Sequence, residues 1–137
     1  MKKLVMAIVA TFIVLMATNY LVHSVWLMPD YDAIPLSHRN PWSMRHRFWL
    51  LVLGQVSFSA MFAYIYTRGR ENKPWMAQGI RYGILVTLLT VIPTSLTEYT
   101  VYIIPHELAI KWMVAGSIQM ILAGLVVGTI FKDGATS

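Results

Sequence analysis

The chain has 137 residues, of which 57% are hydrophobic and only 12% are charged. Soluble domains carry about a quarter charged residues, so this composition excludes an ordinary soluble protein. The absence of cysteine excludes disulfides, thiolate nucleophiles and iron–sulfur clusters. The net charge of +5 comes from basic residues at expected helix ends, which indicates membrane topology and no nucleic-acid partner.

Four apolar runs follow one another, each long enough to cross a bilayer, which takes roughly 17–25 residues in a helix. They predict an all-α polytopic membrane protein, a single four-helix transmembrane bundle over residues 1–137. We expect transmembrane helices at about 4–28, 42–67, 77–104 and 106–131, with an outer loop at 29–41. The lipid bilayer is therefore the first expected partner.

The first run begins with Lys2 and Lys3, a pattern that signal peptides and membrane helices share. It continues to Met28 without a small-residue cleavage site, so we expect it to remain as a spanning helix. Prolines in the following loop deny it a continuous helix. We expect a solvated loop over the mouth of the bundle, with a lid or partner-docking surface as the alternative.

Two features mark the third and fourth runs. Pro93 lies inside the third run, where a proline removes one backbone hydrogen bond, so we expect a kink or a freed carbonyl. Gly124-x-x-x-Gly128 in the fourth run is typical of close helix contacts. The sequence does not decide whether these contacts lie within the chain or between copies of it.

Basic residues beside the spans predict the orientation of the chain. With the N-terminus inside, seven lie on the inner side and four on the outer side. The inner ones are Lys2, Lys3, Arg68, Arg70, Lys73, Arg81 and Lys132, and the outer ones are Arg39, Arg45, Arg47 and Lys111. This asymmetry predicts a multi-pass protein of the cell inner membrane with both termini in the cytoplasm.

The two halves of the chain share a pattern that indicates an internal repeat. At an offset of 64 positions, Pro41, Arg47 and Gln55 align with Pro105, Lys111 and Gln119. At an offset of 79, the segment 18–23 resembles the segment 97–102. The pattern predicts two parallel helical-hairpin repeats related by an axis along the membrane normal. The alternative is that membrane helices simply share composition.

Polar side chains at membrane depth are the strongest functional signal, because they are costly there and usually face the interior of a bundle. We predict a polar ligand-binding chamber in the outer half of the bundle. Its candidate residues are Asn19, His23, Arg47, Gln55, Glu98, Tyr102, His106, Lys111 and Gln119. The two glutamines would form the floor of this chamber or a clasp between helices.

Several of these residues also have structural explanations. Lys111 follows Glu107 by four residues, an order that favours a helical ion pair, and it could also reach the headgroups. Glutamines buried between helices contribute only about 0.6 kcal/mol on average. His23 and His106 lack a spacing motif, so we expect neither a metal nor a cofactor. Glu98 is either a structural ion-pair partner or the working group of a site.

No HExxH, GxSxG, Walker or Rossmann motif is present, so we favour a non-catalytic role and assign no catalytic residue. In size, number of spans and a polar third helix, the chain resembles the uncharacterised four-helix bacterial inner-membrane proteins grouped as domains of unknown function. The favoured hypothesis is a protein that binds a lipid or small amphiphile or serves as an accessory subunit. A proton-coupled transporter using Glu98 and a lipid-directed membrane enzyme are the alternatives, and a homo-oligomer stays open.

Overall fold

The computed structural model describes residues 1–34 and 41–132, and every regular element in these ranges is a helix. The elements are α1 (Lys2–Tyr20), η1 (Leu21–Trp26), α2 (Met28–Asp32), α3 (Pro41–Gly69), α4 (Trp75–Val86), η2 (Thr87–Val91), α5 (Ile92–Val101) and α6 (His106–Ile130). Arg39 and the rest of the segment 35–40 of the outer loop lie outside the described residues.

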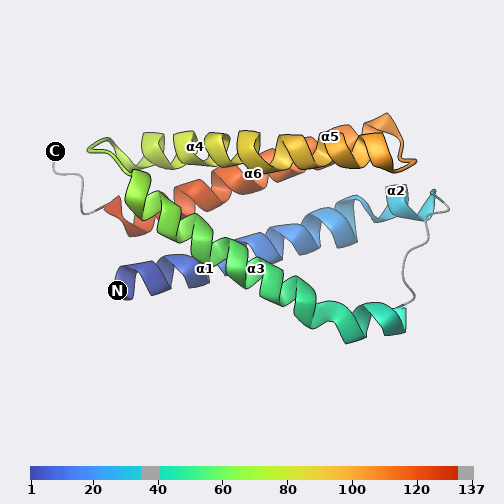
Figure 1. Cartoon of the computed structure of the whole chain (residues 1–137), viewed down its shortest axis with the longest axis horizontal. Helices are drawn as coiled ribbons and strands as arrows, with labels where there is room; N and C mark the ends of the chain where they lie inside the picture. Colours follow the sequence, from blue (N-terminus) through green and yellow to red (C-terminus); the bar gives the residue numbers. More distant parts are fainter. Residues whose placement is uncertain (35–40, 133–137) are drawn as a thin grey trace.

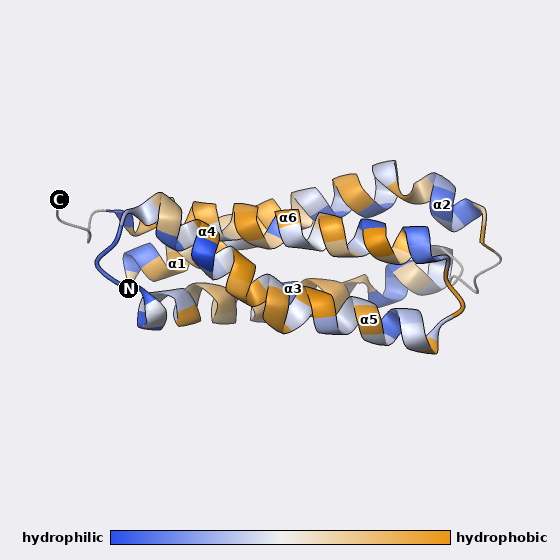
Figure 2. Cartoon of the chain, turned by 90° about the horizontal axis from the view of Figure 1, so that it is seen from above, coloured by the Kyte–Doolittle hydropathy of each residue, from blue (hydrophilic) through white to orange (hydrophobic). Residues whose placement is uncertain are grey.

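Four continuous helices are long and apolar enough to cross a membrane: Lys2–Trp26, Trp42–Gly69, Trp75–Val101 and His106–Ile130. This confirms the predicted all-α chain with four such helices. In the first three, only 17% of the most apolar window is buried inside the molecule, against 39% in the fourth. The exposed remainder is largely apolar, as Figure 2 shows. A soluble monomer rarely presents so much contiguous apolar surface, whereas lipid solvates it.

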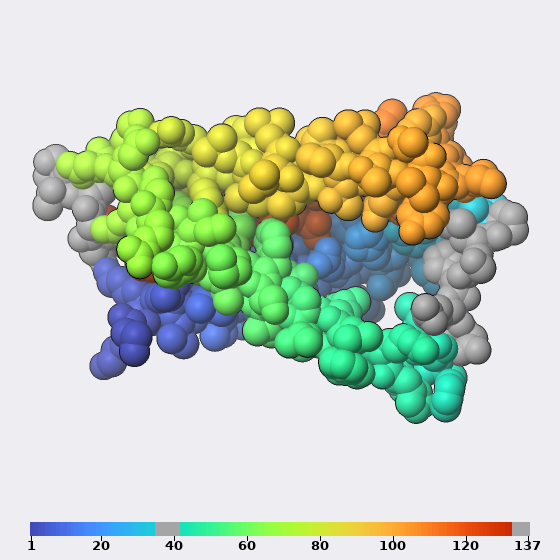
Figure 3. Space-filling view, viewed as in Figure 1, coloured from blue at the N-terminus to red at the C-terminus, as the bar shows by residue number. Residues whose placement is uncertain are grey.

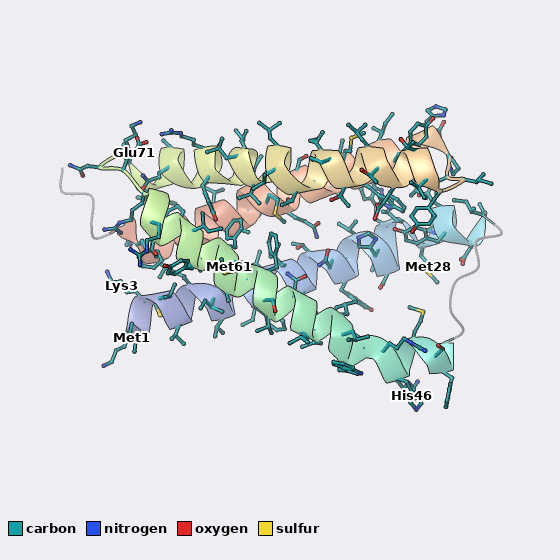
Figure 4. The ribbon with its side chains drawn as sticks, in the orientation of Figure 1. Met1, Lys3, Met28, His46, Met61 and Glu71 are labelled. Carbon is teal, nitrogen blue, oxygen red and sulfur yellow. The ribbon has the colours of Figure 1, made fainter. Side chains whose placement is uncertain are left out.

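Helix α6 is the most buried span and contacts both α1 and the third span, while α1 and α3 cross each other (Figure 1). The N-terminus, the α3–α4 turn and the end of α6 lie together, and α2 lies at the opposite end with the α5–α6 turn. Figure 4 shows Lys3 and Glu71 at the first end and Met28 at the second. Most of the basic residues predicted to be inner therefore share one end of the bundle.

Glycines set the close approach of α4 and α6. A Cβ atom added to Gly79 would lie 2.6 Å from the Gly124 carbonyl oxygen, and one added to Gly83 would lie 2.6 Å from the Ile121 Cα. A Cβ on Gly128 would lie 2.8 Å from the Trp75 carbonyl oxygen. Only glycine permits backbones to approach this closely. The Gly124-x-x-x-Gly128 motif thus serves contacts within the chain.

The first half of α3 departs from the other helices. Figure 3 shows α1 through the opening between α3 and the layer formed by α4 and α5. In Figure 4, His46 points away from the bundle. Gly54 has no atom within 4 Å of an added Cβ, unlike the glycines between α4 and α6. The two helical hairpins therefore pack differently, and the predicted repeat stays a prediction.

Two of the spans contain a π-helical turn. In η1, the Leu27 N–H donates to the Val22 carbonyl five residues back, at 2.8 Å. In η2, the Ile92 N–H bonds in the same way to Thr87, just before Pro93. Proline disrupts the regular α pattern because it lacks an N–H and crowds the carbonyl four residues back. The third span accommodates Pro93 with this wider turn, and such turns are frequent at functional sites.

Candidate functional site

A cavity of about 430 Å³ lies between the first span, the third span and α6. Both π-helical turns contribute to its wall: η1 supplies Val22 and His23, and η2 supplies Thr90 and Val91. The remaining lining residues are Thr94, Ser95, Glu98, Trp112, Ala115, Gly116 and Gln119. The volume falls within the range of roughly 300–1,000 Å³ that is typical of small-molecule sites.

Gln119 forms the deep end of the cavity and joins α6 to α1. Its Nε2 donates to the Thr18 Oγ1 at 3.1 Å and to the Asn19 Oδ1 at 3.0 Å. The Asn19 Nδ2 in turn donates to the Gln55 Oε1 of α3 at 3.4 Å. These amides form a hydrogen-bonded clasp across three helices. At 1.5 Å per residue, Gln119 lies about 20 Å along α6, near the middle of the span.

His23, Tyr31 and Trp112 form a second polar group, nearer the outer end. The Trp112 Nε1 donates to the Tyr31 hydroxyl at 2.8 Å, and the same hydroxyl lies 2.6 Å from the His23 Nδ1. The rings of His23 and Tyr31 stack at 11°, with centroids 6.1 Å apart. Tyr31 thereby attaches the short helix α2 to both the first span and α6.

Helix α2 lies outside the spans, and its environment raises the pKa of Tyr31 above the ordinary value. Burial is the main cause, because it disfavours the charged phenolate. The hydrogen bond from Trp112 lowers the pKa, and the negative charges of Asp30 and Glu98 raise it again. The Tyr31 hydroxyl therefore stays protonated at neutral pH and keeps its hydrogen-bonding capacity.

Lys111 forms an ion pair with Asp30 of α2. The Nζ lies 2.7 Å from one carboxylate oxygen of Asp30 and 2.8 Å from the other. The two side chains are 34% and 29% exposed, so the pair is only partly solvated. The positive charge of Lys111 is thus satisfied by a residue 81 positions away in the chain. It is not paired with Glu107, the helical neighbour that the sequence favours.

Glu98 lines the cavity one turn from the end of α5. Among residues 1–34 and 41–132, no ion pair or hydrogen bond to its carboxylate is formed. Lys111 is already engaged by Asp30, and Arg47 bonds to Ser43 of its own helix. The sequence predicts that Glu98 is either an ion-pair partner or the working group of a site. No described residue forms an ion pair with it.

The predicted chamber residues fall into three groups. The cavity wall contains His23, Glu98 and Gln119, while Asn19 and Gln55 stand behind it through the amide clasp. Lys111 contacts α2 rather than the cavity. Arg47, Tyr102 and His106 are exposed and lie outside the wall. A lipid-directed enzyme would need an acid and a base, for which Glu98 with His23 or His106 are the candidates; His23 and Glu98 share the cavity wall, whereas His106 lies outside it.

Asp30, Tyr31, Trp112 and the hydroxyl residues of the third span are not among the chamber residues that the sequence predicts. The sequence does contain one signal for the wall of the third span. Val91, Thr94, Ser95 and Glu98 are separated by three, one and three residues, which places them on one face of a helix. Asp30 and Tyr31 carried no such signal, because the loop around them reads as solvated. Trp112 matches the pattern of an interfacial tryptophan, which conceals its contact with Tyr31.

No protein-family model matches the chain, and neither the curated proteins nor the solved structures contain a significant match. Among the described residues, no group of three or more histidine, aspartate or glutamate side chains is placed to hold a metal ion. What the cavity offers is one carboxylate, one imidazole, one carboxamide and several hydroxyls on an otherwise apolar wall.

Proposed function

We propose that the protein is a non-catalytic, multi-pass membrane protein that binds a lipid or small amphiphile in the cavity between η1, α5 and α6. The observation that carries the proposal is the composition of the wall, where polar groups interrupt an apolar surface. Such a wall suits a molecule with one polar end and one apolar end. The same surface would serve an accessory subunit that presents this molecule to a larger membrane complex.

The proposal places the chain in the cell inner membrane with both termini cytoplasmic. Four apolar spans support a multi-pass protein, and an even number returns the C-terminal end to the side of the N-terminus. Lys3 and Glu71 lie at that end (Figure 4), and Lys73 and Arg81 form ion pairs with Glu71, so basic residues gather there, as expected for the cytoplasmic side. In this orientation the cavity opens in the outer half of the membrane. Reactivity of single introduced cysteines toward an impermeant reagent would test it.

The binding role is tested by gentle purification from native membranes, followed by lipid analysis. Ala115→Phe places an aromatic ring in the cavity, whereas Val114→Phe places the same ring on the exposed side of α6. We expect the native protein and Val114→Phe to carry a stoichiometric amphiphile and Ala115→Phe to lose it. Equal amounts of bound lipid in all three proteins would refute the use of this cavity.

A proton-coupled transporter is the second candidate. It is favoured by Glu98, which has no ion-pair partner in the described part of the chain and lies close to the π-helical turn of η2. Acidic side chains inside spans are typical of proton relays, and a wide turn beside Pro93 gives the third span a point of adjustment. Uptake driven by a pH gradient in proteoliposomes would test this role. Flux that is identical in Glu98→Gln would remove Glu98 from the mechanism.

A further inference from the structure

The charges around the cavity select among amphiphiles. Within the described part of the chain, Glu98 is the one formally charged side chain in the wall. The cation on the nearest turns of α6, Lys111, is neutralised by Asp30 at 2.7 Å. His23 is the other titratable residue of the wall, and its Nδ1 is engaged by the Tyr31 hydroxyl. Among residues 1–34 and 41–132, the cavity wall therefore contains a single negative charge and no counter-ion for it.

Resting on the proposed function, we infer that the bound amphiphile carries one positively charged nitrogen, as in a long-chain amine or quaternary ammonium, which lies against the Glu98 carboxylate. A buried or half-buried carboxylate is stabilised by an opposite charge. Glu98 is half-buried, and the ligand would supply that charge. An anionic headgroup would meet repulsion from Glu98, and none of the described wall residues is a free cation to offset it.

Trp112 adds a second element of recognition. It lines the cavity, and its Nε1 is fixed by the Tyr31 hydroxyl at 2.8 Å, so the position of the indole is set by α2. Aromatic rings attract cations to their faces, and tryptophan does so most strongly. A carboxylate and an indole in one wall are the combination that recognises substituted ammonium groups. Neither group would favour a neutral or anionic headgroup over a cationic one.

The depth of the lining residues orients the ligand. Glu98 lies about 5 Å from the end of α5, whereas Thr90 lies about 17 Å from it, at 1.5 Å per residue. The deeper wall is mainly small or apolar, with Val91, Ala115 and Gly116. A cationic headgroup at Glu98 with its chain toward the deep end follows the polarity of the bilayer, which is polar outside and apolar at the centre.

The test uses two probes with the same chain, dodecyltrimethylammonium and the neutral tetraethylene glycol dodecyl ether. Saturation binding is measured to protein in phosphatidylcholine nanodiscs, with empty nanodiscs as the partition background. The variants are Glu98→Gln and Glu107→Gln; Glu107 is exposed, lies outside the wall and gives the same change in net charge. We expect Glu98→Gln to weaken cation binding by at least about tenfold and Glu107→Gln to leave it unchanged.

The outcomes separate the inference from the proposed function. Equal affinity of native protein for both probes, with both blocked by Ala115→Phe, would overturn the cationic ligand and leave the amphiphile site intact. No binding of either probe above background, together with no copurified lipid, would overturn both. Should Glu98→Gln fail to fold, the comparison of the two probes on the native protein decides. A preference for the cation below threefold refutes the inference.

Discussion

The ion pair between Asp30 and Lys111 gives the sharpest test of how α2 is held on the bundle. A double-mutant cycle with Asp30→Asn and Lys111→Met removes each charge in turn and then both. Both carboxylate oxygens lie within 2.8 Å of the Nζ, and each side chain is about one third exposed. The cycle measures the coupling free energy of the pair without the other effects of each substitution.

The geometry sets the expected magnitude. Fully exposed ion pairs couple by about 0.2–1 kcal/mol, and removal of one partner from a buried pair costs about 3–5 kcal/mol. A pair with two short contacts and two thirds of its surface covered should lie between these limits. We expect a coupling free energy of about 1–2 kcal/mol, which weakens as salt rises because part of the pair is solvated.

The assay is reversible unfolding in mixed micelles, followed by far-ultraviolet circular dichroism. A second cycle with Glu107→Gln and Lys111→Met serves as the control, because Glu107 precedes Lys111 by one helical turn. Helical neighbours of this kind couple by about 0.2–0.5 kcal/mol at most. A larger coupling for Glu107 than for Asp30 would show that Lys111 pairs along its own helix, and would refute the attachment of α2 described above.

Three further predictions concern packing, the amide clasp and Tyr31. Gly83→Leu should destabilise the protein by at least about 2 kcal/mol, because its side chain meets the backbone of Ile121, whereas Gly54→Leu, in open space, should change the unfolding free energy little. Gln119→Leu should lower the free energy of unfolding by about 1 kcal/mol in the same assay, and Gln55→Leu should lower it by less. The reason is that Gln119 donates two hydrogen bonds near 3.0 Å, whereas Gln55 accepts one at 3.4 Å. A larger loss for Gln55→Leu than for Gln119→Leu would contradict the clasp. The raised pKa of Tyr31 means that the folded state holds the phenol proton more tightly than the unfolded state. The resulting contribution to stability is complete below the ordinary pKa of about 10 and is lost as pH rises through the folded pKa. The difference between tyrosinate absorbance titrations of the native protein and Tyr31→Phe isolates Tyr31, and a Tyr31 pKa below 10 would contradict the prediction.

The sequence predicts the helices well because a membrane helix is specified by local properties. Length and apolar content alone indicate the four spans, and the observed bounds lie close to the expected ones. Part of the chamber is also accessible to such reasoning. His23, Glu98 and Gln119 stand out because a polar group inside an apolar run is costly, and the structure places all three in one cavity wall.

Contacts between distant segments could not be predicted in this way. The i,i+4 rule ranks Glu107 first for Lys111, but the rule contains no information on Asp30, which approaches from α2. Arg47 carries the same polar signal as Lys111, yet it lies on the part of α3 that departs from the bundle. Pro93 indicated a local disturbance in the third span, and only the structure shows it to be a π-helical turn.

That π-helical turn explains why Glu98 shares a face with the glycines of α4. Glu98 follows Gly79 by nineteen residues, and in a regular α-helix, which rotates about 100° per residue, the two would point about 100° apart. A π-helical turn accommodates one additional residue, so the rotation returns to whole turns and both residues face α6. The direction of the Glu98 carboxylate relative to the glycine contacts of α4 therefore depends on this one turn. Pro93 directly follows this turn and does not itself line the cavity.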